Sequence, residues 1–260
     1  MLDLPVPSLI GVVHLSALPG SPLATLDMNE IVGRALADAR NLKEAGFDAA
    51  IVENFGDAPY TASKIGPAST AAMAVVAQAI RLETGLVIGI NALRNDAGAA
   101  LGIAAAAQAC FVRVNVHTGV YATDQGIISG RAGKSLRYRK LLNRRIAIFA
   151  DVHVKHATPL GQPDIDQAAR ETAYRGLADA LIVTGSATGG AVDPDDLVKV
   201  RNAVPDRRLF IGSGATSETI AQLLPLSDGV IVGTGIKQCG QTGNPIDAHL
   251  ARAFVKAARP

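Results

Sequence analysis

The chain has 260 residues, of which 48% are hydrophobic and 18% are charged. This balance excludes a largely disordered chain and fits a single α/β domain whose parallel strands are covered on both faces. The formal net charge is only +2 and the positive residues are scattered. The dense basic face that nucleic acid requires is therefore excluded as well.

The cysteines and the apolar runs place the chain in the cytoplasm. Cys110 and Cys239 have no spacing typical of a zinc site or a disulfide framework. The N-terminus has no signal-peptide pattern, and no window reaches the roughly 18 to 20 uninterrupted apolar residues of a membrane span. The run that comes nearest, Ala99 to Cys110, is better explained as a half-buried helix. We therefore expect a cytoplasmic protein with no segment inserted in a membrane.

Short apolar runs alternate with helical stretches along the whole chain, which is typical of βα units. The predicted strands are Leu9 to Leu15, Ala49 to Asn54, Leu86 to Ala92, Phe111 to Val116, Ile146 to Val154, Ala180 to Thr184, Arg208 to Gly212 and Gly229 to Gly233. Eight units without a linker favour closure over an open doubly wound sheet. We predict an α/β fold, a (β/α)8 TIM barrel, as a single domain over residues 1–260.

Helix start and stop signals support these units. Asp27 precedes a predicted helix from Asn29 to Ala45, and Gly46 follows as its stop. Asp166 precedes a segment rich in alanine and arginine, and Pro194 stands near another predicted helix start.

Polar residues follow the apolar runs, where a barrel of this kind gathers its functional groups. The first three strands end with His14, Glu53 and Asn91, and Arg94 to Asp96 lie just beyond the third. These side chains are candidates for a site at the carboxyl ends of the strands.

The fourth and fifth predicted strands alternate polar and apolar residues with period two. Their polar rows are Arg113, Asn115 and His117 on the fourth strand, and Asp151, His153 and Lys155 on the fifth. Because the helix-facing side of a barrel strand must be apolar, both rows should point into the barrel mouth. Burying such groups is costly unless they pair or bind something, so a ligand site is favoured. The alternative is a purely structural ion pair between Arg113 and Asp151.

The turns after the last two strands are rich in glycine. Gly212, Ser213 and Gly214 follow the seventh strand, and Gly233 and Thr234 follow the eighth. Glycines let backbone N–H groups approach an anion, and barrels often bind phosphate at these two turns. Residues Thr216 to Glu218 predict a helix start, and the dipole of that helix would help to bind the anion. The turns predict a site for a small phosphorylated or similarly anionic molecule, although they are also compatible with plain tight turns.

Two further segments can lie near the ligand. Thr184 begins a flexible polar turn that runs to Gly190 and either closes over the ligand or is a plain loop. Thr118 to Ser135, which includes Asp124, is longer than a usual βα connection and is either a lid or a solvated surface.

The chain resembles the BtpA/SgcQ family over nearly its whole length. The matching stretches are Gly11 to Leu15, Leu18 to Pro22, Glu53 to Asp57, Gly89 to Asn91, Leu93 to Asp96, Phe111 to Val116, Thr123 to Gly126, Arg137 to Arg139, Ala150 to His156 and Val232 to Lys237. The resemblance implies a TIM barrel of the ribulose-phosphate-binding type. One member of the family is linked to the biogenesis of a photosynthetic membrane complex, but no settled reaction comes with the resemblance. Residues Ser227 to Thr234 are also similar to the phosphate-binding end of the barrel in the tryptophan synthase α subunit.

Two classes of function follow. The first is an enzyme acting on a phosphorylated sugar or related anionic metabolite, by isomerase, epimerase or aldolase-type proton transfer next to a carbonyl. Gly214, Gly233 and Thr234 would hold the phosphate. The proposed catalytic residues are Glu53 and Asp151 for proton transfer, His14 or His153 to assist, Arg113 or Lys155 to stabilise an oxyanion, and Lys155 alternatively as a Schiff-base amine.

A divalent metal, zinc or manganese, is an alternative within this class, held by Glu53, Asp151, His153 and His14. The second class is a non-catalytic biogenesis or assembly factor for a membrane complex of the photosystem I type. Barrels of this size often form homo-oligomers, which we also expect here.

Overall fold

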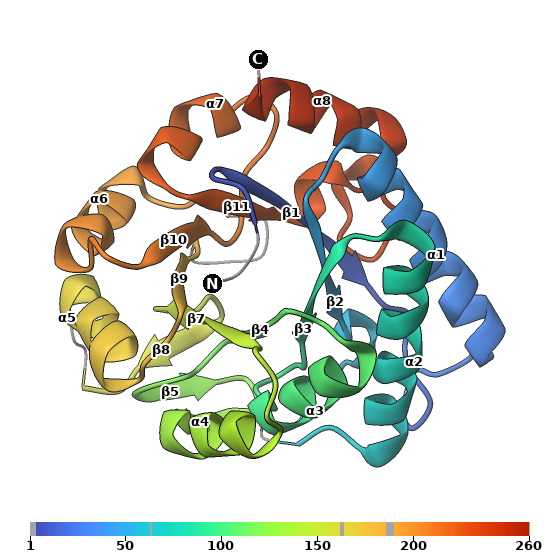
Figure 1. Ribbon diagram of the computed structural model, residues 1–260, viewed down its shortest axis with the longest axis horizontal. Coiled ribbons are helices and arrows are strands. Elements are labelled where there is room, and N and C mark those ends of the chain that lie inside the picture. The colour runs from blue at the N-terminus through green and yellow to red at the C-terminus, as the bar shows by residue number, and fades with distance from the viewer. Residues whose placement is uncertain (1–3, 63, 162–163, 186–189, 260) are drawn as a thin grey trace.

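The computed structural model describes residues 4–62, 64–161, 164–185 and 190–259. Eight parallel strands form a closed barrel in the order β1-β11-β10-β9-β7-β4-β3-β2 (Figure 1). These strands are β1 (Ser8–His14), β2 (Ala49–Glu53), β3 (Val87–Asn91), β4 (Phe111–Val114), β7 (Ala147–Val152), β9 (Ala180–Val183), β10 (Arg208–Ile211) and β11 (Gly229–Val232). The predicted TIM barrel is confirmed, and each of the eight predicted strands is present with somewhat different ends.

Helices surround the ring of strands (Figure 1). They are α1 (Met28–Ala45), α2 (Pro67–Thr84), α3 (Ala97–Ala107), α4 (Ala132–Leu141), α5 (Ile165–Arg170), α6 (Pro194–Ala203), α7 (Ile220–Leu223) and α8 (Ala248–Ala258). Short helical turns complete the set: η1 (Phe55–Asp57), η2 (Glu171–Arg175), η3 (Leu224–Leu226), η4 (Thr234–Ile236) and η5 (Gln238–Gly240).

The helix start and stop signals predicted from the sequence are present at α1 and α6. Asp27 and Glu30 form a reciprocal capping box, and Gly46 ends α1 in the left-handed conformation at φ 96°. Pro194 is the first residue of α6, as expected. Asp166 was expected to precede a helix, but α5 begins at Ile165, so Asp166 lies inside its first turn.

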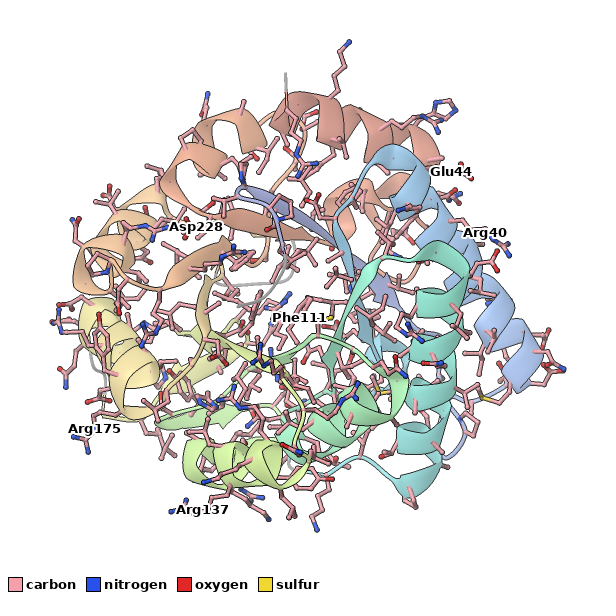
Figure 2. The ribbon with its side chains drawn as sticks, in the orientation of Figure 1. Arg40, Glu44, Phe111, Arg137, Arg175 and Asp228 are labelled. Carbon is pink, nitrogen blue, oxygen red and sulfur yellow. The ribbon has the colours of Figure 1, made fainter. Side chains whose placement is uncertain are left out.

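Aromatic rings pack against one another in the barrel interior. Phe111, Phe149 and Phe210 come from three strands of the ring, and their centroids are 4.6 Å apart for the first pair and 4.8 Å for the second. Figure 2 shows Phe111 at the centre of the ring, whereas Arg137 and Arg175 lie at its periphery. These rings make the barrel interior a packed core rather than a pore.

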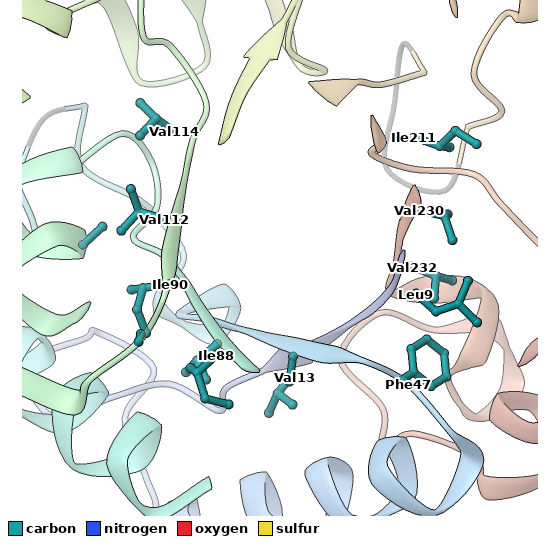
Figure 3. Close-up of a cluster of buried hydrophobic side chains, with 14 of the residues drawn as sticks. Leu9, Val13, Phe47, Ile88, Ile90, Val112, Val114, Ile211, Val230 and Val232 are labelled. Carbon is teal, nitrogen blue, oxygen red and sulfur yellow. The ribbon is translucent and has the colours of Figure 1, made fainter. Parts of the chain in front are cut away.

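A second apolar layer lies between the strands and the helices (Figure 3). On β1, Leu9 and Val13 pack in this outer layer, while Ile10 and Val12 belong to the barrel interior. This alternation has the period of two that a strand imposes. It places His14, the last residue of β1, on the interior side.

A small antiparallel sheet stands beside the barrel. It contains β6 (Gly126–Ser129), β5 (Val120–Thr123) and β8 (Ala157–Pro159) in that order. Val116, Tyr121, Ile128 and Val154 form its own apolar cluster. The segment Thr118 to Ser135 is thus largely a hairpin, and the loop after β7 supplies its third strand. Within the described ranges, no helix is both long and apolar enough to cross a membrane.

Candidate functional site

A cavity of about 770 Å³ opens at the carboxyl ends of the strands. This volume is typical of a small-molecule site. The predicted site residues that line it are His14, Glu53, Asn91, Arg113, Asn115, Asp124, Lys155, Gly212, Ser213, Gly214, Gly233 and Thr234. Side chains far apart in the sequence therefore meet at one cavity.

The strand registers explain why four of these residues lie side by side. His14 pairs with Glu53 across β1 and β2, Glu53 with Asn91 across β2 and β3, and Asn91 with Arg113 across β3 and β4. The Glu53 carboxylate accepts a 2.6 Å hydrogen bond from Asn91 Nδ2, and its other oxygen lies 3.5 Å from His14 Nε2. The interior row thus holds one carboxylate between an amide and an imidazole.

The electrostatic environment keeps His14 neutral. Burial lowers its pKa well below the usual value, and the positive charges of Lys237, Lys155 and Arg113 add to this effect. Its ring also lies against the turn after β11, because a Cβ atom on Gly233 would come within 2.7 Å of its Cε1 atom. A neutral imidazole can exchange a proton with a ligand near neutral pH.

Arg113 and Asp151 form a buried ion pair at the cavity floor, where Arg113 lines the cavity. Arg113 Nε donates to Asp151 Oδ1 at 3.0 Å and Nη2 donates to Oδ2 at 3.1 Å, while Asn115 Nδ2 adds a bond of 2.9 Å. The Asp151 side chain is 0% exposed and does not line the cavity. Its oxygens accept from Arg113 and Asn115 and so position these two side chains, and the expectation that Asp151 faces the ligand for proton transfer is wrong.

Two histidines of the predicted polar rows lie elsewhere. β4 ends at Val114, and His117 is buried with Nε2 2.8 Å from the carbonyl oxygen of Gly176. β7 ends at Val152, and His153 adopts the left-handed conformation at φ 50°. Neither lines the cavity. The prediction that both rows point into the mouth was wrong for these two residues, because alternation stops where the strand stops.

Lys155 lines the cavity, although the strand has ended before it. Its backbone N–H donates to Thr184 Oγ1 at 3.1 Å, and Thr184 Oγ1 is 3.4 Å from the His153 carbonyl oxygen. Thr184 was expected to bind substrate, but it does not line the cavity and instead orients this backbone. Burial lowers the Lys155 pKa, and the charge of Arg113 lowers it further. In the described part of the chain, no carboxylate lies within 4.0 Å of the Lys155 ammonium.

The glycine turns after β10 and β11 also line the cavity. Gly214 has φ +71°, and a Cβ atom there would come within 2.0 Å of the Gly190 carbonyl oxygen. The Ser213 hydroxyl accepts from Gly185 N at 3.0 Å, so it holds the neighbouring turn. Part of that turn, residues 186–189, lies outside the described residues, including most of the predicted flexible stretch.

The helix dipole expected at these turns is small. Thr216 to Glu218 do not begin a helix, since α7 starts at Ile220 and has only four residues. After β11 the chain forms only the three-residue turn η4. In the described part of the chain, the N–H groups of Gly214 and Gly235 have no backbone acceptor. Any anion held here would rely on such backbone donors.

Several lining residues were not singled out as site residues from the sequence. They are Phe55, Tyr60, Gln125, His156, Thr216 and Thr242. Gln125 stands next to the predicted Asp124 in the sequence. Arg94, a candidate from its place just after the third strand, also lines the cavity. Phe55 packs on His14 with ring centroids 4.9 Å apart. Burial, followed by the negative charge of Glu53, raises the Tyr60 pKa. The Tyr60 hydroxyl donates to the Phe55 carbonyl oxygen at 2.6 Å.

The metal site considered from the sequence does not form among the described residues. They contain no group of three or more His, Cys, Asp or Glu side chains placed to hold a metal ion. Asp151 is already bound to Arg113 and Asn115, and His153 is outside the cavity. Glu53 and His14 remain, which are too few for a protein-held metal.

The closed ring and the cavity at the carboxyl ends of its strands define a TIM-barrel protein with a candidate small-molecule site. Solved structures of this class are similar to it. Thiamine phosphate pyrophosphorylase from Pyrococcus furiosus has a TM-score of 0.62 at 14% identity, with 97% of this chain and 95% of that chain covered. Phosphoribosyl anthranilate isomerase from Thermus thermophilus has a TM-score of 0.59 at 13% identity, with 96% and 97% covered. At these identities the likeness shows the fold alone.

Sequence comparison then defines the family. The BtpA family model matches residues 6–260, so the chain belongs to the BtpA family. It is 47% identical to an uncharacterised protein of Thermococcus kodakarensis (96% of this chain, 95% of the relative). It is 44% identical to the photosystem I biogenesis protein BtpA of Synechocystis (95% and 86%). It is 30% identical to the putative sgc region protein SgcQ of Escherichia coli (96% and 93%).

Proposed function

We propose that this protein is an enzyme that acts on a phosphorylated sugar or a related small anionic metabolite. The observation that carries the proposal is the composition of one cavity. The cavity is lined by the glycine turns, which carry backbone donors, and by Glu53, which lies between His14 and Asn91. A phosphate on the glycine turns would bring the rest of the molecule over the Glu53 carboxylate.

The proposed chemistry is proton transfer next to a carbonyl group, as in an isomerase, an epimerase or an aldolase. Glu53 removes the proton, because its carboxylate faces the cavity and has a neutral imidazole beside it. Lys155 and Arg113 supply positive charge for the oxyanion that develops on the carbonyl oxygen.

Lys155 also permits an alternative with a covalent step. Its lowered pKa leaves more of the free amine, which can add to a substrate carbonyl and form a Schiff base with loss of water. Borohydride trapping in the presence of substrate separates the two forms. Covalent labelling that disappears in Lys155→Ala supports the Schiff base, and absence of labelling in an active enzyme supports simple acid and base catalysis.

A thermal-shift screen over sugar phosphates and nucleotides tests the proposal. A ligand present at about 100 times its dissociation constant stabilises the folded state by about 2.7 kcal/mol. A binding sugar phosphate should then show slow exchange of its carbon-bound hydrogen with deuterated water, and Glu53→Gln should abolish the exchange while retaining binding. If no phosphorylated compound protects the protein, the proposal fails.

The relative named photosystem I biogenesis protein BtpA favours a second candidate, a non-catalytic assembly factor for a membrane complex. Scaffolding does not require a buried carboxylate, imidazole and lysine in one cavity, so we favour the enzyme. Stable capture of a membrane complex by the purified protein, together with no protection by any phosphorylated compound, would reverse this preference.

A further inference from the structure

Arg94 is a buried cation of the cavity that the proposed chemistry does not use. The residue is 6% exposed and lines the cavity. Its Nη2 atom donates to the Lys155 carbonyl oxygen at 2.7 Å. In the described part of the chain, no carboxylate lies within 4.0 Å of its guanidinium. A buried arginine is almost always paired, so this one lacks its expected counter-charge.

The backbone on both sides of Arg94 is fixed by asparagine side chains. Asn54 Oδ1 accepts from Leu93 N at 2.7 Å. On the other side, Asn95 both accepts from Val116 N and donates to Val116 O at 2.9 Å. These bonds tie the turn after β3 to the neighbouring turns. Arg94 is therefore held in a preorganised position rather than on a free loop.

Positive charge gathers around this end of the cavity. Arg94 and Lys155 both lie here, and the charge of Arg94 is among the causes that lower the Lys155 pKa. Two carboxylates of the described residues line the cavity: Glu53 accepts from Asn91, and Asp124 is exposed and accepts from Gln125. An anion from the ligand would relieve the repulsion between the two cations.

The ring order places this end opposite the glycine turns. Arg94 follows β3 and Gly212 follows β10, and three strands separate β3 from β10 in either direction around the ring. A phosphate bound at the Gly212 turn therefore lies across the ring from Arg94. A second negative group at the far end of the same molecule would lie toward Arg94.

We infer that the substrate carries two anionic groups at its opposite ends, with a phosphate on the glycine turns and a second phosphate or a carboxylate on Arg94. This inference rests on the proposed function, because the first anionic group is the phosphate proposed there. It narrows the substrate class to elongated phosphorylated compounds with a second acidic end.

Isothermal titration with synthetic probes tests the inference. The probes are the bisphosphates of butane-1,4-diol, pentane-1,5-diol and hexane-1,6-diol, the monophosphates of the same diols, and 5-phosphooxypentanoate for a carboxylate end. A symmetric probe gains only about twofold from its two orientations. A charge-assisted bond to Arg94 should instead make at least one bisphosphate or the carboxylate probe bind about tenfold tighter or more than its monophosphate.

Variants identify the residue responsible. Arg94→Gln should reduce the preference to about the statistical twofold while the monophosphates bind as in the wild type. Arg175→Gln is the matched control, since Arg175 is exposed at the periphery (Figure 2). Circular dichroism and thermal midpoints establish folding. If Arg94→Gln does not fold, Arg94→Lys replaces it and should weaken the preference, because an ammonium lacks the forked guanidinium donors.

The outcomes separate the two proposals. Equal binding of monophosphates and doubly anionic probes by the wild type would refute the Arg94 site and leave the proposed function standing. A preference that survives in Arg94→Gln would also refute it. Absence of binding by every probe and by the sugar phosphates would overturn the proposed function itself.

Discussion

Replacing Asp151 by Asn should be among the most destabilising changes in the barrel mouth. The substitution keeps the shape of the side chain but removes its charge. Asp151 is 0% exposed and Arg113 is 4% exposed, so the guanidinium would remain buried without a counter-charge. Of the two hydrogen bonds that Arg113 donates to Asp151, one would be lost, because an amide offers only one acceptor oxygen and a guanidinium cannot accept.

Breaking one partner of such a pair typically costs about 3 to 5 kcal/mol. At about 2 to 4 °C per kcal/mol for a chain of this size, the midpoint of thermal unfolding should fall by about 6 to 20 °C. Urea unfolding followed by circular dichroism measures the free energy directly, and an unchanged dependence on urea establishes that the folded state is intact.

The double variant Arg113→Met with Asp151→Leu is the control. Because both charges are removed together, it should recover most of the loss, as apolar replacements of buried ion pairs often do. If Asp151→Asn unfolds within about 1 kcal/mol of the wild type, the ion pair does not hold the cavity floor, and the reasoning that assigns Asp151 a positioning role is refuted.

Three further predictions follow from single residues. Burial lowers the His14 pKa below the unfolded value near 6.5, so the unfolded chain binds the proton more readily and stability falls as pH decreases below 6.5, by up to about 1.4 kcal/mol per pH unit. Urea unfolding at pH 7 and 5.5 should show a smaller pH effect in His14→Gln, and equal effects would contradict this. Gly214→Ala should lose phosphate binding and stability, since its φ is +71° and its Cβ would strike a backbone oxygen; intact phosphate affinity in calorimetry would refute this. The control Gly33→Ala, at an exposed position of α1, should stabilise by about 0.5 to 1 kcal/mol. Lys237→Met should destabilise by about 3 to 5 kcal/mol, because it leaves the buried Asp38 unpaired, and rescue by adding Asp38→Asn checks the cause.

The local sequence was sufficient for the fold and for part of the site. Short apolar runs predict the eight strands, and the polar residues that end them, His14, Glu53 and Asn91, are candidates because a barrel gathers functional groups there. The period of two on the fourth strand predicts that Arg113 points inward. Asp27 and Gly46 mark the ends of α1 because capping depends on neighbouring backbone groups alone. These are properties of contiguous residues, so no tertiary information is needed to infer them.

Other parts of the site depend on where each strand ends. His117 and His153 continue the polar alternation in the sequence, yet both lie beyond the last paired residue of their strands. The pairing partner on the neighbouring strand sets that end, and the sequence pattern carries no record of it. The hairpin of β5 and β6 was not predicted for the same reason, because β5 also pairs with β8 from a distant part of the chain.

The contacts made by Arg94 and Lys237 arise only in the folded chain. Arg94 binds the carbonyl oxygen of Lys155, 61 residues away, and Lys237 pairs with Asp38 across 199 residues. Periodicity and capping reveal which face a residue occupies, because they depend on a few bonds of backbone geometry. The pairing of each buried charge with its counter-charge depends on closure of the ring, because only closure brings the ends of all eight strands to one cavity. Closure therefore also decides which buried charge lacks a counter-charge.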